Sequence, residues 1–282
     1  MKKTVMILLV GIAINVAIAQ QHIPTLDDYK RFLTSKTMVV WDEVQLSQFN
    51  WKIKEVMDRA WTLTPVEYIT FKEFEKLKND PDLSFIINNV ASFDSDKIKA
   101  RFDFLSLLMG QPDQKLRNLP DLCSLPLSYA QVDDDTYSYK LEAFILFMQA
   151  YVNEVLADPT LIGDLGFKKY SKKKGGNLSD KTLYLLKNEV AKDINDEKKI
   201  KAVYPYAVKF VTPEEIEAAI ARRDNNVVFM HKVGPTRTTA KTRVYKIIVG
   251  AGDSKLYFHT HQMMKSAADN AIQAKDLKKM SK

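Results

Sequence analysis

The chain has 282 residues, a formal net charge of +7 and a single cysteine, Cys123. One cysteine cannot form an internal disulfide, so the composition excludes a disulfide-held scaffold, and the length is sufficient for two domains that each bury a core. The positive charge is not concentrated in the way that nucleic-acid-binding proteins require, and we expect no nucleic-acid partner. Cys123 lies in the apolar run "LCSLPLSY", where a buried and unreactive thiol is expected.

Residues 1–19 predict a signal peptide for export. Lys2 and Lys3 give a positive start, residues 5–16 are almost wholly apolar, and Ala17-Ile18-Ala19 forms a small-x-small cleavage site. Cleavage would leave Gln20 as the first of 263 residues and lower the formal charge to +5. Gln20 is not a cysteine, so this route gives no lipid anchor, and no later segment is long and apolar enough to cross a membrane. We therefore expect an exported protein, either periplasmic or secreted.

The segment 20–160 predicts a first α/β unit. In chain order its elements are a strand at 35–41 ("SKTMVVW"), an amphipathic helix across 46–60, a strand at 66–70, a short helix, a strand at 83–90 and two more strands at 100–110 and 122–129. The short helix begins at a capping box, Thr70-x-x-Glu73. An apolar stripe at 141–156 predicts an extra helix at the end of this unit.

The segment 179–262 repeats this order. Its matching blocks are "DKTLYLL" at 180–186, "KIKAV" at 199–203, "VKFVT" at 208–212 and a second capping box, Thr212-x-x-Glu215. A strand at 226–233 and a hairpin around Gly252-Asp253 complete the unit. Four collinear blocks predict an internal duplication, in which each β-α-β-α-β-β-β unit forms a mixed sheet covered by helices. The fold class is therefore predicted as α/β, with two tandem units.

Two further segments lie outside the repeats. Residues 161–178 are basic and contain glycine, which predicts a linker between the units. Residues 263–282 predict a C-terminal helix or tail, with Met264, Ala268 and Ile272 on the side that docks on its own domain.

Three histidines, His231, His259 and His261, are the candidate metal ligands. Residues two apart on a strand point to the same face, so the H-x-H pair could supply half of a metal site. In the expected hairpin register, the residues that alternate with the two histidines lie on the apolar core face of the sheet. They are Leu256, Phe258 and Thr260. The two histidines would then lie beside Lys246, whose charge disfavours a metal ion. His231 also aligns with Asn88 of the first unit, so polar histidines on a sheet face are the simpler interpretation, and no cofactor is predicted.

A basic run supplies the other candidate site. Its members are Lys168, Lys169, Lys172, Lys173 and Lys174. Such a run is usually solvated, but it could also contact an anionic envelope polymer. The catalytic motifs G-x-S-x-G, H-E-x-x-H and C-x-x-C are missing from the sequence, so no catalytic residue is predicted.

Several segments carry a resemblance to bacterial envelope domains. "TMVVW" (37–41), "VEYIT" (66–70), "TFKEFEKL" (70–77) and "FIINNV" (85–90), with their second copies, resemble in order the TolB amino-terminal domain and the periplasmic domain of the curli secretion channel. This resemblance implies binding of protein partners in place of catalysis. The chain lacks the lipid-anchor cysteine of the channel family, so pore formation is not implied. The leader followed by Gln20 also looks like those of proteins exported by Bacteroidota.

Together these observations predict a non-enzymatic exported protein that acts as a binding or assembly module for a protein partner in the envelope. Two alternatives remain open at the level of sequence. One is a metal-dependent hydrolase built on His231, His259 and His261, and the other is a protein that binds anionic glycan or peptidoglycan through the basic run.

Overall fold

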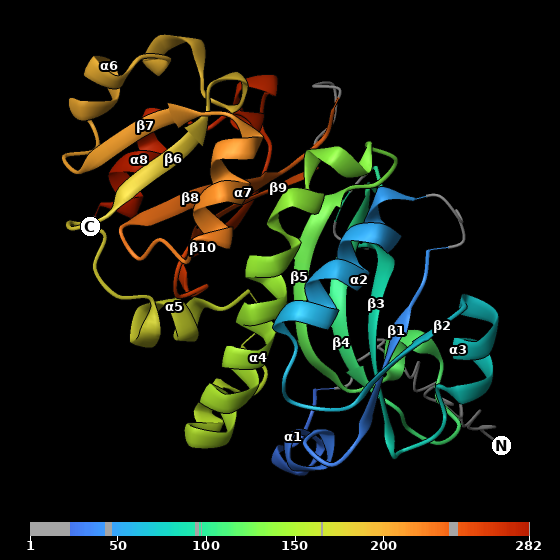
Figure 1. The fold of residues 1–282 in the computed structure, drawn as a ribbon. Coiled ribbons are helices and arrows are strands. Elements are labelled where there is room, and N and C mark those ends of the chain that lie inside the picture. The colour runs from blue at the N-terminus through green and yellow to red at the C-terminus, as the bar shows by residue number, and fades with distance from the viewer. Residues whose placement is uncertain are drawn as a thin grey trace, which may run out of the picture.

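A computed structural model describes residues 23–42, 47–93, 96, 98–164, 166–236 and 242–281. The predicted signal peptide, residues 1–19, lies outside the described residues. Two α/β bodies lie side by side, with one long helix at their junction (Figure 1). Across the described ranges, no helix combines the length and the apolar character that a membrane span needs.

The first body is a five-stranded mixed sheet with order β2-β1-β3-β4-β5. Its strands are β1 (Lys36–Val40), β2 (Val66–Ile69), β3 (Leu83–Ser92), β4 (Arg101–Met109) and β5 (Asp121–Tyr129). Its helices are α1 (Leu26–Phe32), α2 (Gln48–Ala60), α3 (Phe71–Leu77) and α4 (Leu141–Ala157). β1 runs parallel to β2 and β3, whereas β4 and β5 add to the sheet in antiparallel fashion.

The second body has the order β10-β9-β8-β6-β7. Its strands are β6 (Thr182–Leu186), β7 (Ala207–Val211), β8 (Val227–Val233), β9 (Arg243–Gly250) and β10 (Leu256–Met263). Its helices are α6 (Glu197–Lys201), α7 (Pro213–Ala221) and α8 (Ala274–Met280), and α5 (Lys168–Lys174) connects the two bodies. β6 is parallel to β7 and β8, and β9 and β10 are antiparallel.

The second sheet thus repeats the strand order and every strand direction of the first. The register of β1 with β3 matches that of β6 with β8, because Thr37 lies opposite Ser84 and Thr182 lies opposite Val227. The pairing with the second strand of each unit differs by one residue, since Thr37 lies opposite Val66 but Thr182 lies opposite Ala207. The predicted α/β fold with two similar β-α-β-α-β-β-β units is therefore confirmed.

Both predicted capping boxes are present. The Thr70 hydroxyl accepts a hydrogen bond from the Glu73 amide, and the Glu73 carboxylate accepts one from the Thr70 amide in return. Thr212 and Glu215 make the same reciprocal pair at the start of α7, where Pro213 occupies the first turn.

The helix α4 is buried on nearly all sides. Its buried residues include Phe144, Phe147, Met148 and Val152, and a helix that is apolar all round must lie inside a core. It packs against α1, α2 and β5 of the first unit, and its other side meets α7 and the sheet of the second unit (Figure 1). One continuous hydrophobic core therefore runs through both units.

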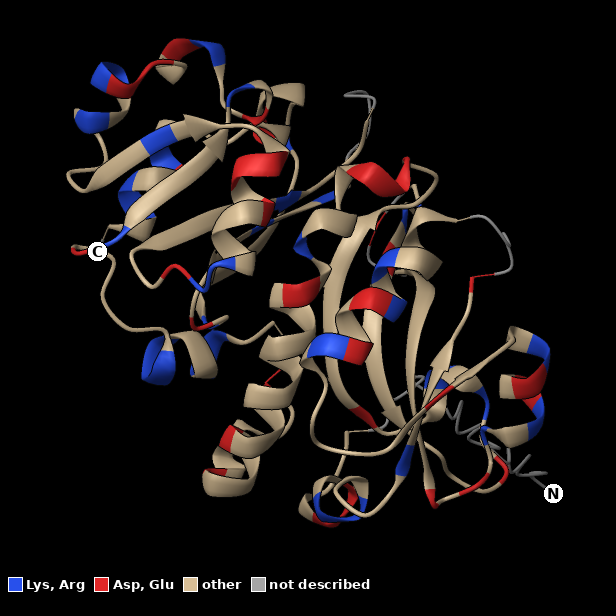
Figure 2. Cartoon of the chain, viewed as in Figure 1, with Lys and Arg blue, Asp and Glu red and all other residues tan. Residues whose placement is uncertain are grey.

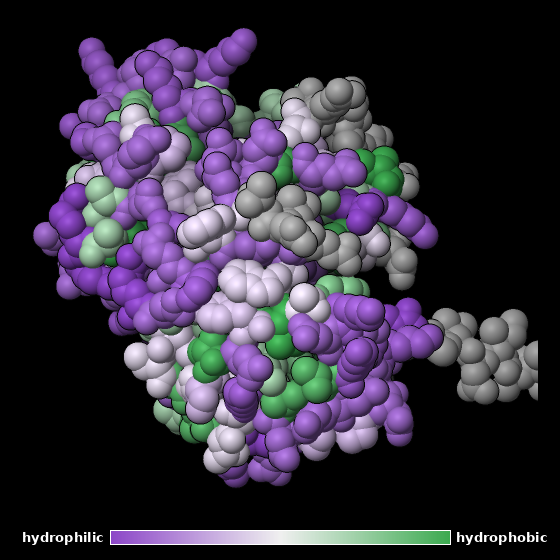
Figure 3. Space-filling model, turned by 45° about the vertical axis from the view of Figure 1, so that its right-hand side comes forward, coloured by the Kyte–Doolittle hydropathy of each residue, from purple (hydrophilic) through white to green (hydrophobic). Residues whose placement is uncertain are grey.

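The outer face of each sheet has a separate cover. Phe74 of α3 packs edge-on against Phe85 at a ring distance of 5.0 Å in the first unit. In the second unit, α6 and α8 cover the sheet through apolar residues that include Ile200, Leu277 and Met280. Most of the remaining surface is hydrophilic on the face seen in Figure 3.

Two segments differ in detail from expectation. The predicted linker contains a helix, α5, because Tyr170 is 1% exposed and anchors the segment beside β10. The C-terminal segment was expected to be helical from Met263, but β10 runs to that residue and the α-helix begins only at Ala274. Ile272 is buried as predicted, whereas Ala268 is exposed.

Candidate functional site

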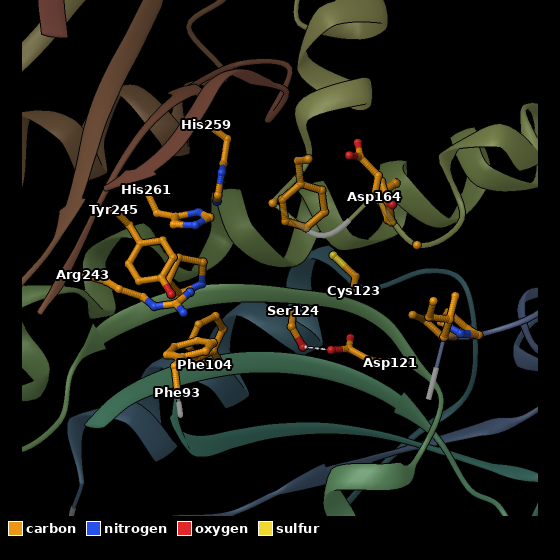
Figure 4. A pocket seen from close by; sticks show the side chains of 18 of the residues that line it. Phe93, Phe104, Asp121, Cys123, Ser124, Asp164, Arg243, Tyr245, His259 and His261 are labelled. Atoms are coloured by element: carbon orange, nitrogen blue, oxygen red, sulfur yellow. Dashed lines mark hydrogen bonds between the residues drawn. The ribbon is translucent and has the colours of Figure 1, made fainter. Parts of the chain in front are cut away.

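A pocket of about 420 Å³ lies between the two units. The last strand of each unit forms part of its wall, β5 on one side and β10 on the other. These strands occupy equivalent positions at the edges of the two sheets, and side chains from both line the pocket (Figure 4).

The wall from the first unit is rich in aromatic rings. Phe93, Phe104, Tyr29 and Tyr151 line it. The hydroxyl of Tyr29 donates to the Leu122 carbonyl at 2.7 Å, and that of Tyr151 donates to the Leu161 carbonyl at 3.0 Å. Their polar atoms are thus bonded to the backbone, and the rings contribute mainly apolar surface to the pocket.

The acidic side of the pocket consists of Asp121, Ser124 and Asp164. The Ser124 hydroxyl donates to Asp121 Oδ2 at 2.7 Å, and the Tyr170 amide donates to Asp164 Oδ2 at 2.7 Å. Cys123 also lines the pocket, and burial raises the pKa of its thiol well above the ordinary value. The thiol is therefore kept protonated, in agreement with the expected unreactive cysteine.

The wall from the second unit carries Arg243 and Tyr245 of β9 with His259 and His261 of β10 (Figure 4). The guanidinium of Arg243 lies 3.8 Å from the centre of the Phe93 ring, across the junction of the units. Burial raises the pKa of Tyr245 to about 12, and the charge and hydrogen bond of Arg243 partly oppose this rise.

The predicted register of the hairpin was wrong. A β-bulge between Leu256 and Phe258 shifts the pairing by one residue, so that His259 lies opposite Ile247 and His261 opposite Tyr245. The histidines therefore face the pocket, and Phe258 faces the outer core. The cation expected beside the histidines, Lys246, lies on the other face, where it is buried against Asp276.

His259 is almost fully enclosed in this wall, with 7% of its surface exposed. Its ring packs edge-on against Phe167 at a centroid distance of 5.7 Å. Burial, followed by the charges of His261 and Lys168, lowers its pKa to about 3, so the imidazole is neutral at pH 7. Gly166 lies beside this ring and has φ +85°, a left-handed backbone conformation that favours glycine.

His231 lies apart from the pocket. Its Nε2 is 2.8 Å from the Pro126 carbonyl, which only accepts, so Nε2 carries the proton and donates it. Its Nδ1 is then the acceptor for the buried Lys140 ammonium at 3.4 Å. Burial and the Lys140 charge lower the pKa of His231 well below its ordinary range. Both ring nitrogens have partners, which gives His231 a structural role at the junction of the units.

The three candidate metal ligands are thus divided between two places, with His259 and His261 in the pocket and His231 behind it. Among the residues that the structure describes, no three His, Cys, Asp or Glu side chains are grouped so that they could hold a metal ion. The arrangement gives no support to a hydrolase built on the three histidines together.

The five lysines of the basic run lie on or beside α5. They are Lys168, Lys169, Lys172, Lys173 and Lys174. Lys173 pairs with Asp158 at 2.8 Å, Lys174 pairs with Glu154 at 2.7 Å, and Lys169 donates to the Thr160 carbonyl at 3.2 Å. Figure 2 shows the basic α5 beside the acidic C-terminal part of α4. Much of the run is therefore engaged within the molecule, which leaves less charge for a polyanion.

Sequence patterns located the two pocket histidines but missed the rest of the site. Arg243, Tyr245 and Asp121 lie at strand starts or inside apolar strands, where the local pattern gives no functional signal. A weak signal existed in the glycines Gly163 and Gly166, which have positive φ and line the pocket. Comparison with protein-family models, curated proteins and solved structures finds no match to this chain.

Proposed function

We propose that this protein is an exported, non-enzymatic binding protein that holds a ligand between its two duplicated units. The observation that carries the proposal is the pocket to which both units contribute. Its volume of about 420 Å³ suits a small organic molecule or a short peptide segment, and junctions between domains are common places for such sites.

The chemistry of the walls supports binding over catalysis. The Ser124 hydroxyl is bonded to Asp121 and lies 2.6 Å from the Ser106 hydroxyl, so its neighbours are not those of a serine activated by a histidine base. Cys123 is held as a neutral thiol by burial. Aromatic walls with a few fixed polar groups are typical of recognition sites.

Filling the pocket provides the direct test. Ser124 is half-buried on the pocket wall, so Ser124→Phe places a ring inside it, whereas Ser92→Phe places one at an exposed position of the same sheet. Native mass spectrometry of the protein purified from its host should show the chain with a bound small molecule for the wild type and Ser92→Phe. The bound mass should be missing from Ser124→Phe. Repeated recovery of the bare wild-type chain would count against the proposal.

The proposed location of the protein is the cell envelope or the medium. We also propose that it binds a protein partner there. The predicted leader and the resemblance to partner-binding envelope domains support it. Cell fractionation with amino-terminal sequencing should find the protein outside the cytoplasm, beginning at Gln20. Affinity capture from envelope extracts should recover a partner with the wild type, and a protein recovered only as a lone chain contradicts this part.

A further inference from the structure

We infer that the pocket between the units binds an anionic amphipathic ligand, an aromatic or aliphatic body that carries a carboxylate or another acidic group, with the acid held by Arg243, His259 and His261. This inference rests on the proposed function, because it specifies the ligand of the same pocket.

The basic end of the pocket is built from contacts that fix its geometry. Phe93 lies under the Arg243 guanidinium, and Tyr245 shares a hydrogen bond with it. The Tyr245 ring lies 5.7 Å from the ring of His261. Lys168 adds a second positive charge close enough to act on both pocket histidines. These groups give one end of the pocket a positive field with fixed donors.

The pocket histidines have hydrogen-bonding capacity that the protein does not use. Within the described part of the chain, the rings of His259 and His261 make no hydrogen bond, although His259 is more than nine-tenths buried. Burial and nearby cations keep both imidazoles neutral, and a neutral imidazole always carries one N–H donor. An N–H donor on the pocket wall that has no partner within the protein can donate to an oxygen of a bound ligand.

The opposite end of the pocket gives the ligand its direction. Asp121 and Asp164 lie away from Arg243 in the pocket (Figure 4) and accept hydrogen bonds from Ser124 and from the Tyr170 amide. Their negative charges repel an acidic group, so the acid of the ligand lies at the Arg243 end. The aromatic walls between the two ends receive its apolar body. A cationic ligand would meet Arg243 on the pocket wall and the field of the nearby Lys168, and is disfavoured.

Two fluorescent probes distinguish the contribution of the acidic group to binding from that of the apolar body. 8-Anilinonaphthalene-1-sulfonate and N-phenyl-1-naphthylamine share the same aromatic body, and only the first carries a sulfonate. Both should bind the wild type and lose binding in Ser124→Phe. The sulfonate probe should bind more tightly, because its acid reaches Arg243 and the histidines.

Two variants then remove the basic end. Arg243→Gln and His261→Asn should each weaken the sulfonate probe, by about tenfold to a hundredfold for Arg243→Gln, since a charge-assisted hydrogen bond is lost. Binding of the neutral probe should change by less than about twofold, within ordinary mutational scatter. Arg222→Gln, an exposed arginine of the same unit, is the matched control and should leave both probes unchanged.

The outcomes distinguish a failure of the proposed binding function from a failure of the inferred anionic ligand. If neither probe binds the wild type, the pocket is not a binding site and the proposed function fails. If both probes bind equally and neither Arg243→Gln nor His261→Asn separates them, the pocket binds but the anionic ligand is wrong. If the sulfonate probe instead depends on Lys172 and Lys173, it binds the exposed helix and the inference is overturned. His261 is exposed, so its variant remains informative should Arg243→Gln fail to fold.

Discussion

The two units have the same strand order, yet they cover their sheets differently. In the first unit α2 spans 13 residues and packs on the sheet together with α4, whereas its counterpart α6 in the second unit has only five residues and lies on the opposite face. The inner face of the second sheet, which includes Phe229 and Ile247, is covered by α7 and by α4 of the first unit. The second copy therefore depends on a helix that the first copy supplies.

The polar positions of the two units have also diverged. His231 stands where the first unit has Asn88, and the register of the paired strands supports this alignment. At the last strand, the first unit presents Asp121 and Ser124 to the pocket and the second presents His259 and His261. The two sheets share one strand order, and the different residues on their equivalent last strands give the pocket an acidic and a basic end.

The largest expected effect comes from breaking the shared core. Phe144 of α4 is 1% exposed and its ring lies 4.7 Å from the ring of His231. Phe144→Ala should lower the free energy of unfolding by about 3–5 kcal/mol, because it leaves a cavity between the units. Urea unfolding followed by circular dichroism measures this change.

The same experiment tests whether the units unfold together. All three tryptophans, Trp41, Trp51 and Trp61, belong to the first unit, so their fluorescence reports on that unit alone. Fluorescence and circular dichroism transitions should coincide in the wild type, as expected for one cooperative body. Two separated transitions would show that the second unit does not depend on α4. Phe71→Ala, at an exposed position of α3, is the control and should have a small effect.

Local patterns predicted the repeated elements well, because the capping boxes and strand runs are set by neighbouring residues. Thr70 and Thr212 start their helices as expected. The pattern at 141–156 predicted a helix but not its position between two sheets, which depends on contacts with distant strands. The bulge after Leu256 reversed the faces of His259 and His261, and a one-residue slip of this kind leaves no mark in an alternating sequence.

Acidification should destabilise the protein through buried histidines of the second unit. Burial lowers the pKa of His231 and His259 below the unfolded value near 6.5, so their neutral forms are favoured by folding. This contribution is fully present above pH 6.5 and is lost as the pH falls, by about 1.4 kcal/mol per pH unit for each histidine. Between pH 7 and pH 5 each should therefore cost about 2 kcal/mol of stability, measurable by urea unfolding at the two pH values.

A substitution that copies the equivalent residue of the first unit provides the control for this pH dependence of stability. His231→Asn introduces the side chain that the equivalent position carries, Asn88, and removes one titrating group. The loss of stability between pH 7 and pH 5 should then be smaller than that of the wild type by about 2 kcal/mol. An unchanged loss would mean that His231 does not titrate on unfolding in this range.

A smaller effect is expected at the charged contacts between the units. Glu142 of α4 is buried and bonds to Arg59 of the first unit and to Arg223 of the second, the latter at 2.6 Å. Glu142→Gln should lower the free energy of unfolding by about 1–3 kcal/mol, because two half-exposed guanidinium groups lose a buried carboxylate. Glu217 pairs with Lys52 across the same junction, but its side chain is 41% exposed against 7% for Glu142, and Glu217→Gln should cost less than about 1 kcal/mol. Urea unfolding measures both losses in the free energy of unfolding. Equal losses in the two variants would contradict the expectation that the buried carboxylate contributes more.

The smallest effects are expected at the capping threonines, which occupy equivalent positions in the two units and allow their direct comparison. Thr70→Ala and Thr212→Ala each remove one capping hydroxyl from the same reciprocal motif, and each should cost about 1 kcal/mol. Because one core joins both units, the loss should appear in the single unfolding transition whichever copy is changed, and the double variant should lose the sum. Urea unfolding of the two single variants and the double variant gives these values. If Thr212→Ala leaves the transition of the tryptophans in place while Thr70→Ala shifts it, the two copies fold as independent bodies and the pocket between them must form after folding.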